Sequence, residues 1–140
     1  MTLQLPPDVV AFLQQPRQMA VLATLSSTQF PHLTPVWYLF DAADLWIWMR
    51  QTRRKVRHLT ARNQVGVYIQ ASDDPHKGVT LQGTAELTHD SLAERCLQIA
   101  RRYLEPDELL IWHEHMLYSK NILARITPTA FARNGSSWNL

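Results

Sequence analysis

A basic segment between residues 50 and 62 carries the clearest chemical signal in the sequence. Its charged side chains are all arginine or lysine: Arg50, Arg53, Arg54, Lys55, Arg57 and Arg62. No aspartate or glutamate occurs from Leu45 to Ser72, so no acidic residue nearby in the sequence balances these charges. Arginine and lysine at close spacing are the side chains that bind phosphate and other anions. The segment therefore predicts an anion site, whose ligand could be a nucleotide, a phosphorylated metabolite or a nucleic-acid backbone.

The predicted local structure of this segment strengthens the anion interpretation. Thr52 is a suitable N-cap for a helix that runs to Arg62. Arg53, Arg54 and Lys55 then lie in its first turn, where the helix dipole makes each cation unfavourable by about 0.3–1 kcal/mol. A bound phosphate would relieve this conflict by accepting hydrogen bonds from the helix N–H groups and from the side chains. A solvated helix face is the alternative interpretation of such a basic segment.

The elements that must position this segment are mostly strands. Hydrophobic alternation and turn residues predict strands at 19–25, 32–40, 45–50, 65–69, 79–87, 122–127 and 130–133. Helices are predicted after Pro6, from Thr52, from Asp90 as N-cap to about Leu104, and after Pro106. Because strands and helices do not alternate regularly, we expect a mainly β fold, an antiparallel barrel with a few helices on its outside. Pro35 within the second strand suggests an edge position or a bulge.

The composition is that of one globular domain covering residues 1–140. The chain has 140 residues, 46% of them hydrophobic, and a net charge of +2, which does not by itself indicate binding to nucleic acid or membrane. Cys96 is the single cysteine, so the chain has no disulfide framework and suits a reducing compartment. The N-terminus has neither a signal-peptide pattern nor a membrane span, and we expect a cytoplasmic protein.

Two further groups of residues could carry chemistry but favour structural roles. His113 and His115 flank Glu114, yet helical zinc sites need two histidines four residues apart, because residues two apart point to different faces. We therefore predict no metal site. Cys96 lies among apolar residues at helical spacing, which is typical of an unreactive core thiol.

Four segments in register resemble the pyridoxamine 5′-phosphate oxidase-like split barrels, a family that binds FMN or a related deazaflavin. The resemblance extends from about residue 16 to residue 88 and rests on residues 31–37 (PHLTPVW), 45–49 (LWIWM), 53–59 (RRKVRHL) and, as the fourth segment, 78–79 (GV) with 83–86 (GTAE). It implies an antiparallel Greek-key split β-barrel with a few peripheral helices. It also implies a homodimer with the flavin at the subunit interface.

The resemblance also implies which residues bind the cofactor. In the family, an arginine and a lysine that match Arg54 and Lys55 hold the flavin phosphate, and the position that matches Gly78 comes from the partner subunit. The implied cofactor-binding residues are Pro35, Val36, Trp37, Tyr38, Trp48, Met49, Arg53, Arg54, Lys55 and Gly78. No catalytic acid, base or nucleophile is implied, because a flavin performs hydride chemistry itself.

We therefore expect an FMN-binding oxidoreductase that acts on an unknown small molecule. A deazaflavin-dependent reductase of the same fold is an alternative, because its extended phosphate-linked tail would suit the many arginines. A non-catalytic flavin- or haem-binding protein is another. A surface for single-stranded nucleic acid, built from the basic segment with Trp46 and Trp48, ranks last because the net charge is small and the cations occupy one window.

Overall fold

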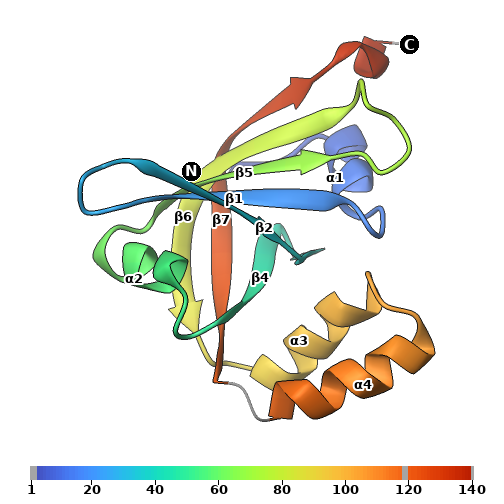
Figure 1. Ribbon diagram of the computed structural model, residues 1–140. Coiled ribbons are helices and arrows are strands. Elements are labelled where there is room, and N and C mark those ends of the chain that lie inside the picture. Colours follow the sequence, from blue (N-terminus) through green and yellow to red (C-terminus); the bar gives the residue numbers. More distant parts are fainter. Residues whose placement is uncertain (1–2, 118–119, 140) are drawn as a thin grey trace.

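Seven strands form one antiparallel sheet in the computed structural model, which describes residues 3–117 and 120–139 (Figure 1). The strands are β1 (Met19–Leu25), β2 (Pro31–Val36), β3 (Tyr38–Asp41), β4 (Asp44–Arg50), β5 (Gln64–Gln70), β6 (Gly78–Thr88) and β7 (Asn121–Asn134). The helices are α1 (Pro7–Leu13), α2 (Arg54–Ala61), α3 (Leu92–Arg101), α4 (Pro106–Leu117) and the 3₁₀ turn η1 (Ser136–Asn139). Within the described residues, no helix has the length and apolar character needed to span a membrane.

The sheet curls so far that its two edges approach each other. Its strand order is β2-β1-β5-β6-β7-β4-β3, so β2 and β3 are the two edge strands. Trp37 alone joins them in the chain, and consecutive Cα atoms are only about 3.8 Å apart. The edges must therefore meet at Trp37, which makes the curled sheet a split barrel and confirms the predicted mainly β fold class.

The prediction of one strand over residues 32–40 is wrong because the chain changes sheet edges at Trp37. Pro35 lies in β2 opposite Val21 of β1, and β2 has no neighbour on its other side. The edge position predicted from Pro35 is confirmed, since an edge strand tolerates a residue without an N–H. Tyr38 starts β3 and pairs instead with Ile47 of β4.

Alternate side chains of the strands fill the barrel interior. In β6, for example, Val79 and Leu81 are fully buried while Thr80 between them is half-buried. The interior also takes large side chains from five other elements: Leu22, Ile47, Ile69, Ile126, Val56 and Leu59. This packing fixes α2 against the barrel through one face and leaves its basic residues on the outside.

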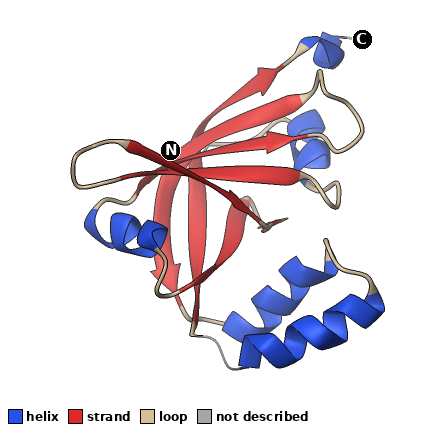
Figure 2. Cartoon of the chain, viewed as in Figure 1, coloured by secondary structure: helices blue, strands red, loops and turns tan. Residues whose placement is uncertain are grey.

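A second apolar cluster lies between the outer face of β4 and β7 and the helices α3 and α4 (Figure 2). Trp46 and Leu123 from the strands pack there with buried residues of the two helices: Cys96, Ile99 and Met116. Both faces of β4 are therefore covered, which accounts for its bulky alternating side chains.

Two predicted helix caps are wrong. The helix α2 begins after Arg53, not Thr52, and no side chain of the described residues caps it. The helix α3 begins after Ser91, not Asp90, and ends at Arg101. Ser91 adopts a left-handed conformation with φ 52°, so the tight turn after β6 displaces Asp90 from the cap position.

The two strands predicted at residues 122–127 and 130–133 are one strand, β7, with an irregularity in the middle. The register between β6 and β7 shifts between Gln82 and Gly83, where Gly83 pairs with Pro128. A Cβ atom on Gly83 would lie 2.3 Å from the carbonyl oxygen of Thr127. Only glycine lets the two backbones approach this closely, so the proline is accommodated without ending the strand.

Candidate functional site

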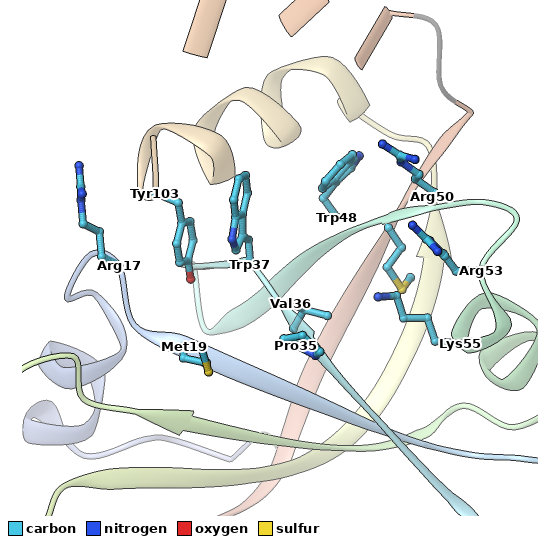
Figure 3. A pocket seen from close by; sticks show the side chains of 11 residues that line it. Arg17, Met19, Pro35, Val36, Trp37, Trp48, Arg50, Arg53, Lys55 and Tyr103 are labelled. Carbon is cyan, nitrogen blue, oxygen red and sulfur yellow. The ribbon is translucent and has the colours of Figure 1, made fainter. Parts of the chain in front are cut away.

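A cavity of about 450 Å³ opens where the two sheet edges meet, a size typical of small-molecule sites. We call it the main cavity. It is bordered by the start of β1, the β2–β3 junction, the end of β4, the start of α2 and the end of α3 (Figure 3). The lining residues are Arg17, Met19, Pro35, Val36, Trp37, Trp48, Met49, Arg50, Arg53, Lys55 and Tyr103.

One end of the main cavity is strongly basic. Arg50 ends β4, Arg53 is the N-cap residue of α2, and Lys55 lies in the first turn of that helix. The first turn contains no acidic residue. Burial lowers the pKa of the Lys55 ammonium, and the charge of Arg53 lowers it further. An anion at this end would offset both effects, so the electrostatics favour a negatively charged ligand group.

A second hollow, the side cavity, adjoins this basic end. Arg53 and Lys55 border both cavities, and the side cavity is further lined by His32, Thr34, Pro35, Thr52, Arg54 and Arg57. In the described residues, Thr34 Oγ1 and His32 Nδ1 are buried there without a hydrogen-bond partner. Cations, a hydroxyl group and an imidazole thus extend the anion-binding surface beyond the main cavity.

His58 supports the wall of the side cavity. Its Nδ1 lies 2.9 Å from the Thr24 hydroxyl oxygen, and its ring meets that of His32 edge to face at 5.1 Å. Burial lowers the pKa of His58, and the neighbouring charges of His32, Arg57 and Arg54 lower it further. His58 is therefore held as a neutral group behind the cations near neutral pH.

Aromatic rings form the opposite wall of the main cavity. Trp37 and Tyr103 are stacked, with ring centroids 5.0 Å apart and planes within 5°. Trp48 meets Trp112 edge to face at 5.7 Å. Trp48 Nε1 is buried and has no hydrogen-bond partner in the described chain. The cavity therefore suits a ligand with a planar apolar ring, an acceptor atom near Trp48 and an anionic group.

Tyr103 is held in a structural role within this wall. Its hydroxyl group donates a hydrogen bond of 2.9 Å to the Gln18 carbonyl oxygen. Burial raises the pKa of Tyr103 to about 12. The phenol therefore stays protonated near neutral pH and contributes a fixed ring surface.

Most of the residues predicted from the sequence lie at the main cavity. Seven of them line it: Pro35, Val36, Trp37, Trp48, Met49, Arg53 and Lys55. Arg54 lines the adjoining side cavity. The two cavities together account for eight of the ten predicted residues, although whether any of them binds a cofactor remains a prediction.

Two predicted residues lie elsewhere in the chain. The Tyr38 side chain is fully buried in the core, where its hydroxyl group donates a 2.8 Å hydrogen bond to the Leu13 carbonyl oxygen. Alternation along β3 turns this side chain inward while its neighbour Trp37 faces the cavity. Gly78 starts β6 opposite Gln70 and does not line the main cavity. Its predicted contact across a dimer interface remains a prediction.

Sequence reasoning missed Arg17, Met19 and Tyr103, and it placed Arg50 in the basic segment without assigning it to the site. Arg17 follows Pro16 in a turn that had no other chemical signal. Residues this far apart in sequence come together only through the curling of the sheet, so no local pattern could have identified them.

The other candidate groups show no reactive arrangement. Cys96 is fully buried, and burial raises the pKa of its thiol to about 12. The predicted role as an unreactive core thiol is confirmed. His113 and His115 lie on α4, and no cluster of three or more histidine, cysteine, aspartate or glutamate residues that could hold a metal occurs in the described part of the chain.

Comparisons with known proteins agree with this architecture. The family model for pyridoxamine 5′-phosphate oxidase matches residues 5–127. An F420 reductase structure superposes with a TM-score of 0.73 at 21% identity, covering 91% of this chain and 98% of that chain. A conserved hypothetical protein from Mycobacterium tuberculosis gives a TM-score of 0.77 at 21% identity, with 96% and 86% of the two chains covered.

A haem storage protein from Vibrio cholerae has the same fold. Its TM-score is 0.69 at 15% identity, and the match covers 94% of this chain and 96% of that chain. No curated protein sequence matches the chain. At these identities the solved structures establish the fold that the chains share.

Proposed function

This chain belongs to the pyridoxamine 5′-phosphate oxidase-like split-barrel family, and on that premise we propose that it binds a flavin and acts as an oxidoreductase on a small molecule. The observation that carries the proposal is the main cavity, in which aromatic and apolar walls lead to a cationic end. An isoalloxazine ring needs the first of these features and a ribityl phosphate needs the second. FMN has both groups.

The residues present fit such a cofactor. Arg53 and Lys55 would hold the phosphate, because they provide charge-assisted donors beside the uncapped start of α2. Trp48 Nε1 would donate a hydrogen bond to the bound molecule, since it is buried without a partner in the described residues. Val36 and Trp37 would provide apolar contact and exclude water from one side of the ring.

The bound flavin would supply the hydride chemistry itself. The chain would contribute orientation and charge, because none of the residues that line the main cavity is a histidine, cysteine or carboxylate. Tyr103 stays protonated near neutral pH owing to its raised pKa, so it serves as a wall and not as a base. Substrate identity is therefore governed by the shape and charge of the remaining cavity.

A deazaflavin coenzyme is the second candidate cofactor, and the side cavity favours it. Arg54 and Arg57 continue the cationic surface past Lys55, which suits a cofactor with anionic groups beyond its first phosphate. The match to an F420 reductase structure is consistent with this alternative.

A non-catalytic carrier is the third alternative, and the match to a haem storage protein is consistent with it. Such a carrier would bind a cofactor but show no turnover with a reductant.

We further propose that the protein is a homodimer whose interface covers the open side of the main cavity. The outward-facing side chains of β1 and β2 are all apolar: Met19, Val21, Ala23, Leu25, Pro31, Leu33 and Pro35. Met19 and Leu33 are 62% and 64% exposed in the single chain. Such a continuous apolar face is typical of a protein–protein interface. Met19 also lines the main cavity, so a partner seated here would lie beside the ligand.

The first experiment is the absorption spectrum of the purified protein, with mass spectrometry of the small molecule that acid releases. A flavin or deazaflavin spectrum is expected. The double variant Arg53→Ala/Lys55→Ala should bind that cofactor at least about 100-fold more weakly, because two charge-assisted contacts are lost. Its circular dichroism should be unchanged, since neither residue belongs to the buried core.

The matched control is Arg62→Ala/Arg101→Ala, which removes two exposed cations from outside both cavities. It should retain the cofactor. A protein that is colourless and takes up neither FMN nor a deazaflavin would refute the proposed function. Equal cofactor affinity in the two double variants would refute the assignment of the phosphate site.

A further inference from the structure

The main cavity has a second cationic end that the cofactor phosphate does not use. Arg17 lies in the turn between α1 and β1 and lines the cavity. Figure 3 shows it on the opposite side of the aromatic wall from Arg50, Arg53 and Lys55. A ligand anchored through its phosphate at Lys55 therefore leaves Arg17 available to another anionic group.

The backbone at Arg17 has a left-handed conformation. Its φ is 62°, in the left-handed region that non-glycine residues seldom occupy. Glycine would adopt this conformation without steric cost. Strained positions of this kind persist where the surrounding structure enforces them and are concentrated at ligand sites.

The turn that carries Arg17 is hydrogen-bonded to the residues that follow α3. The Tyr103 hydroxyl group donates to the Gln18 carbonyl oxygen at 2.9 Å. Arg102 donates to the Gln15 carbonyl oxygen at 2.8 Å. These bonds flank Arg17 on both sides, so the backbone that carries its side chain at the cavity edge is pre-organised.

The present partner of Arg17 is replaceable. Arg17 forms an ion pair with Glu105, and the two side chains are 54% and 60% exposed. Exposed ion pairs of this kind are weak. A guanidinium group has five donors, so a ligand carboxylate can displace or join Glu105.

We propose that Arg17 binds the anionic group of the substrate, and that the substrate is a planar aromatic or conjugated molecule bearing a carboxylate. This proposal rests on the proposed function, in which the Lys55 end holds the cofactor. The stacked rings of Trp37 and Tyr103 lie beside Arg17, so a planar ring has a stacking surface next to its charge partner. None of the residues that line the main cavity is acidic.

The test compares a charged probe with a neutral probe of the same shape. Calorimetry on the protein as purified would measure binding of 2-naphthoate and 2-naphthamide. The wild-type protein should prefer the carboxylate about tenfold or more, as expected for a charge-assisted hydrogen bond. Arg17→Gln should remove this preference. Arg17→Gly should do the same and fold at least as well, because glycine relieves the left-handed backbone.

The variant Glu105→Gln distinguishes a ligand-binding role of Arg17 from a purely structural role of its ion pair with Glu105. It removes the same ion pair as Arg17→Gln but leaves the guanidinium group free, so naphthoate affinity should rise several-fold. A purely structural ion pair would make both variants change in the same direction. Arg62→Gln, a cation outside both cavities, should keep the wild-type preference.

Three results would overturn the proposal: equal binding of the two probes by the wild type, a preference that survives in both Arg17 variants, or a fall in naphthoate affinity in Glu105→Gln. Cofactor content is measured on the same preparations. A wild type that binds neither a flavin nor a deazaflavin refutes the proposed function. A flavin-loaded protein without Arg17-dependent selectivity refutes only the assignment of the substrate.

Discussion

At the residue scale, the most informative feature is a set of cations placed where the helix dipole opposes them. Arg53, Arg54 and Lys55 surround the start of α2, which has no acidic residue in its first turn. Each cation there costs about 0.3–1 kcal/mol. Burial lowers the pKa of Lys55, and the charge of Arg53 lowers it further. A bound anion resolves this conflict, so the local instability is itself an indication of the ligand's charge.

The pKa of Lys55 predicts a pH dependence of anion binding. A bound anion stabilises the ammonium form, so Lys55 has a higher pKa in the complex than in the free protein. Binding is then coupled to proton uptake between these two values. The affinity for inorganic phosphate should therefore fall as the pH rises through the lowered pKa toward 10.5, the ordinary value. Isothermal titration calorimetry across this range would measure it.

Lys55→Arg is the matched control, because arginine stays protonated throughout this range. Its phosphate affinity should be nearly independent of pH. An equal loss of affinity in the wild type and in this variant would show that Lys55 is not the titrating group.

At the element scale, the start of α2 lacks a stabilising side-chain cap and has a cation in the cap position instead. Arg53 occupies the N-cap position with φ −72° and ψ 151°, and its side chain does not cap the helix. This extended conformation is the one in which serine or aspartate caps a helix. The backbone N–H groups at the start of α2 therefore have no capping side chain. The edge strand β2 likewise has no strand partner on its outer side. Both elements leave hydrogen-bonding groups beside the cavities.

Replacement of Arg53 by serine should separate stability from binding. Arg53→Ser supplies a capping hydroxyl group, so the free energy of unfolding should rise by about 1 kcal/mol. Cofactor affinity should fall, because one of the cations lining both cavities is lost. Urea denaturation and cofactor titration would measure the two effects.

Arg62→Ser at the C-cap of the same helix is the control and should change neither quantity appreciably. Unchanged cofactor affinity in Arg53→Ser would remove Arg53 from the anion site. A loss of stability would contradict the assignment of the cap.

At the scale of the whole molecule, the curled sheet creates both the cavity and an apolar outer face. Curling brings the edge strands β2 and β3 together at Trp37. It also leaves the outer face of β1 and β2 without a covering helix, whereas α3 and α4 cover the side formed by β4 and β7. The apolar face and the cavity share Met19, so dimer formation and ligand binding are expected to depend on each other.

A charge on this face should dissociate the dimer and release the cofactor together. Leu33→Asp places a carboxylate on β2 at a position that is 64% exposed in the single chain, so the folded monomer should tolerate it. Sedimentation velocity should show a monomer, and its flavin absorbance should be lost.

The control is Leu110→Asp, a comparably exposed leucine on α4, which should remain dimeric and coloured. A Leu33→Asp protein that stays dimeric would refute the interface. A monomer that keeps its flavin would refute the shared site.

The sequence by itself determined most of the strands and the basic helix, and it predicts an anionic ligand. The alternation of Val79, Leu81 and Ala85 predicts a strand with one buried face, and β6 has that pattern. The acid-free segment around Lys55 predicts an anion site whatever the fold, because charge does not depend on distant residues. Eight of the ten predicted residues consequently lie at one of the two cavities.

Only the tertiary structure decided where the strand pairing breaks and which distant residues complete the cavity. Residues 32–40 have the composition of one strand, yet closure of the barrel divides them at Trp37 between two sheet edges. Likewise, only the fold turns Tyr38 into the core and brings Arg17 and Tyr103 to the cavity. The physical reason is the sequence distance over which each property acts. Alternation and charge are local properties of the chain, whereas closure of the sheet brings together residues as far apart in sequence as Arg17 and Tyr103.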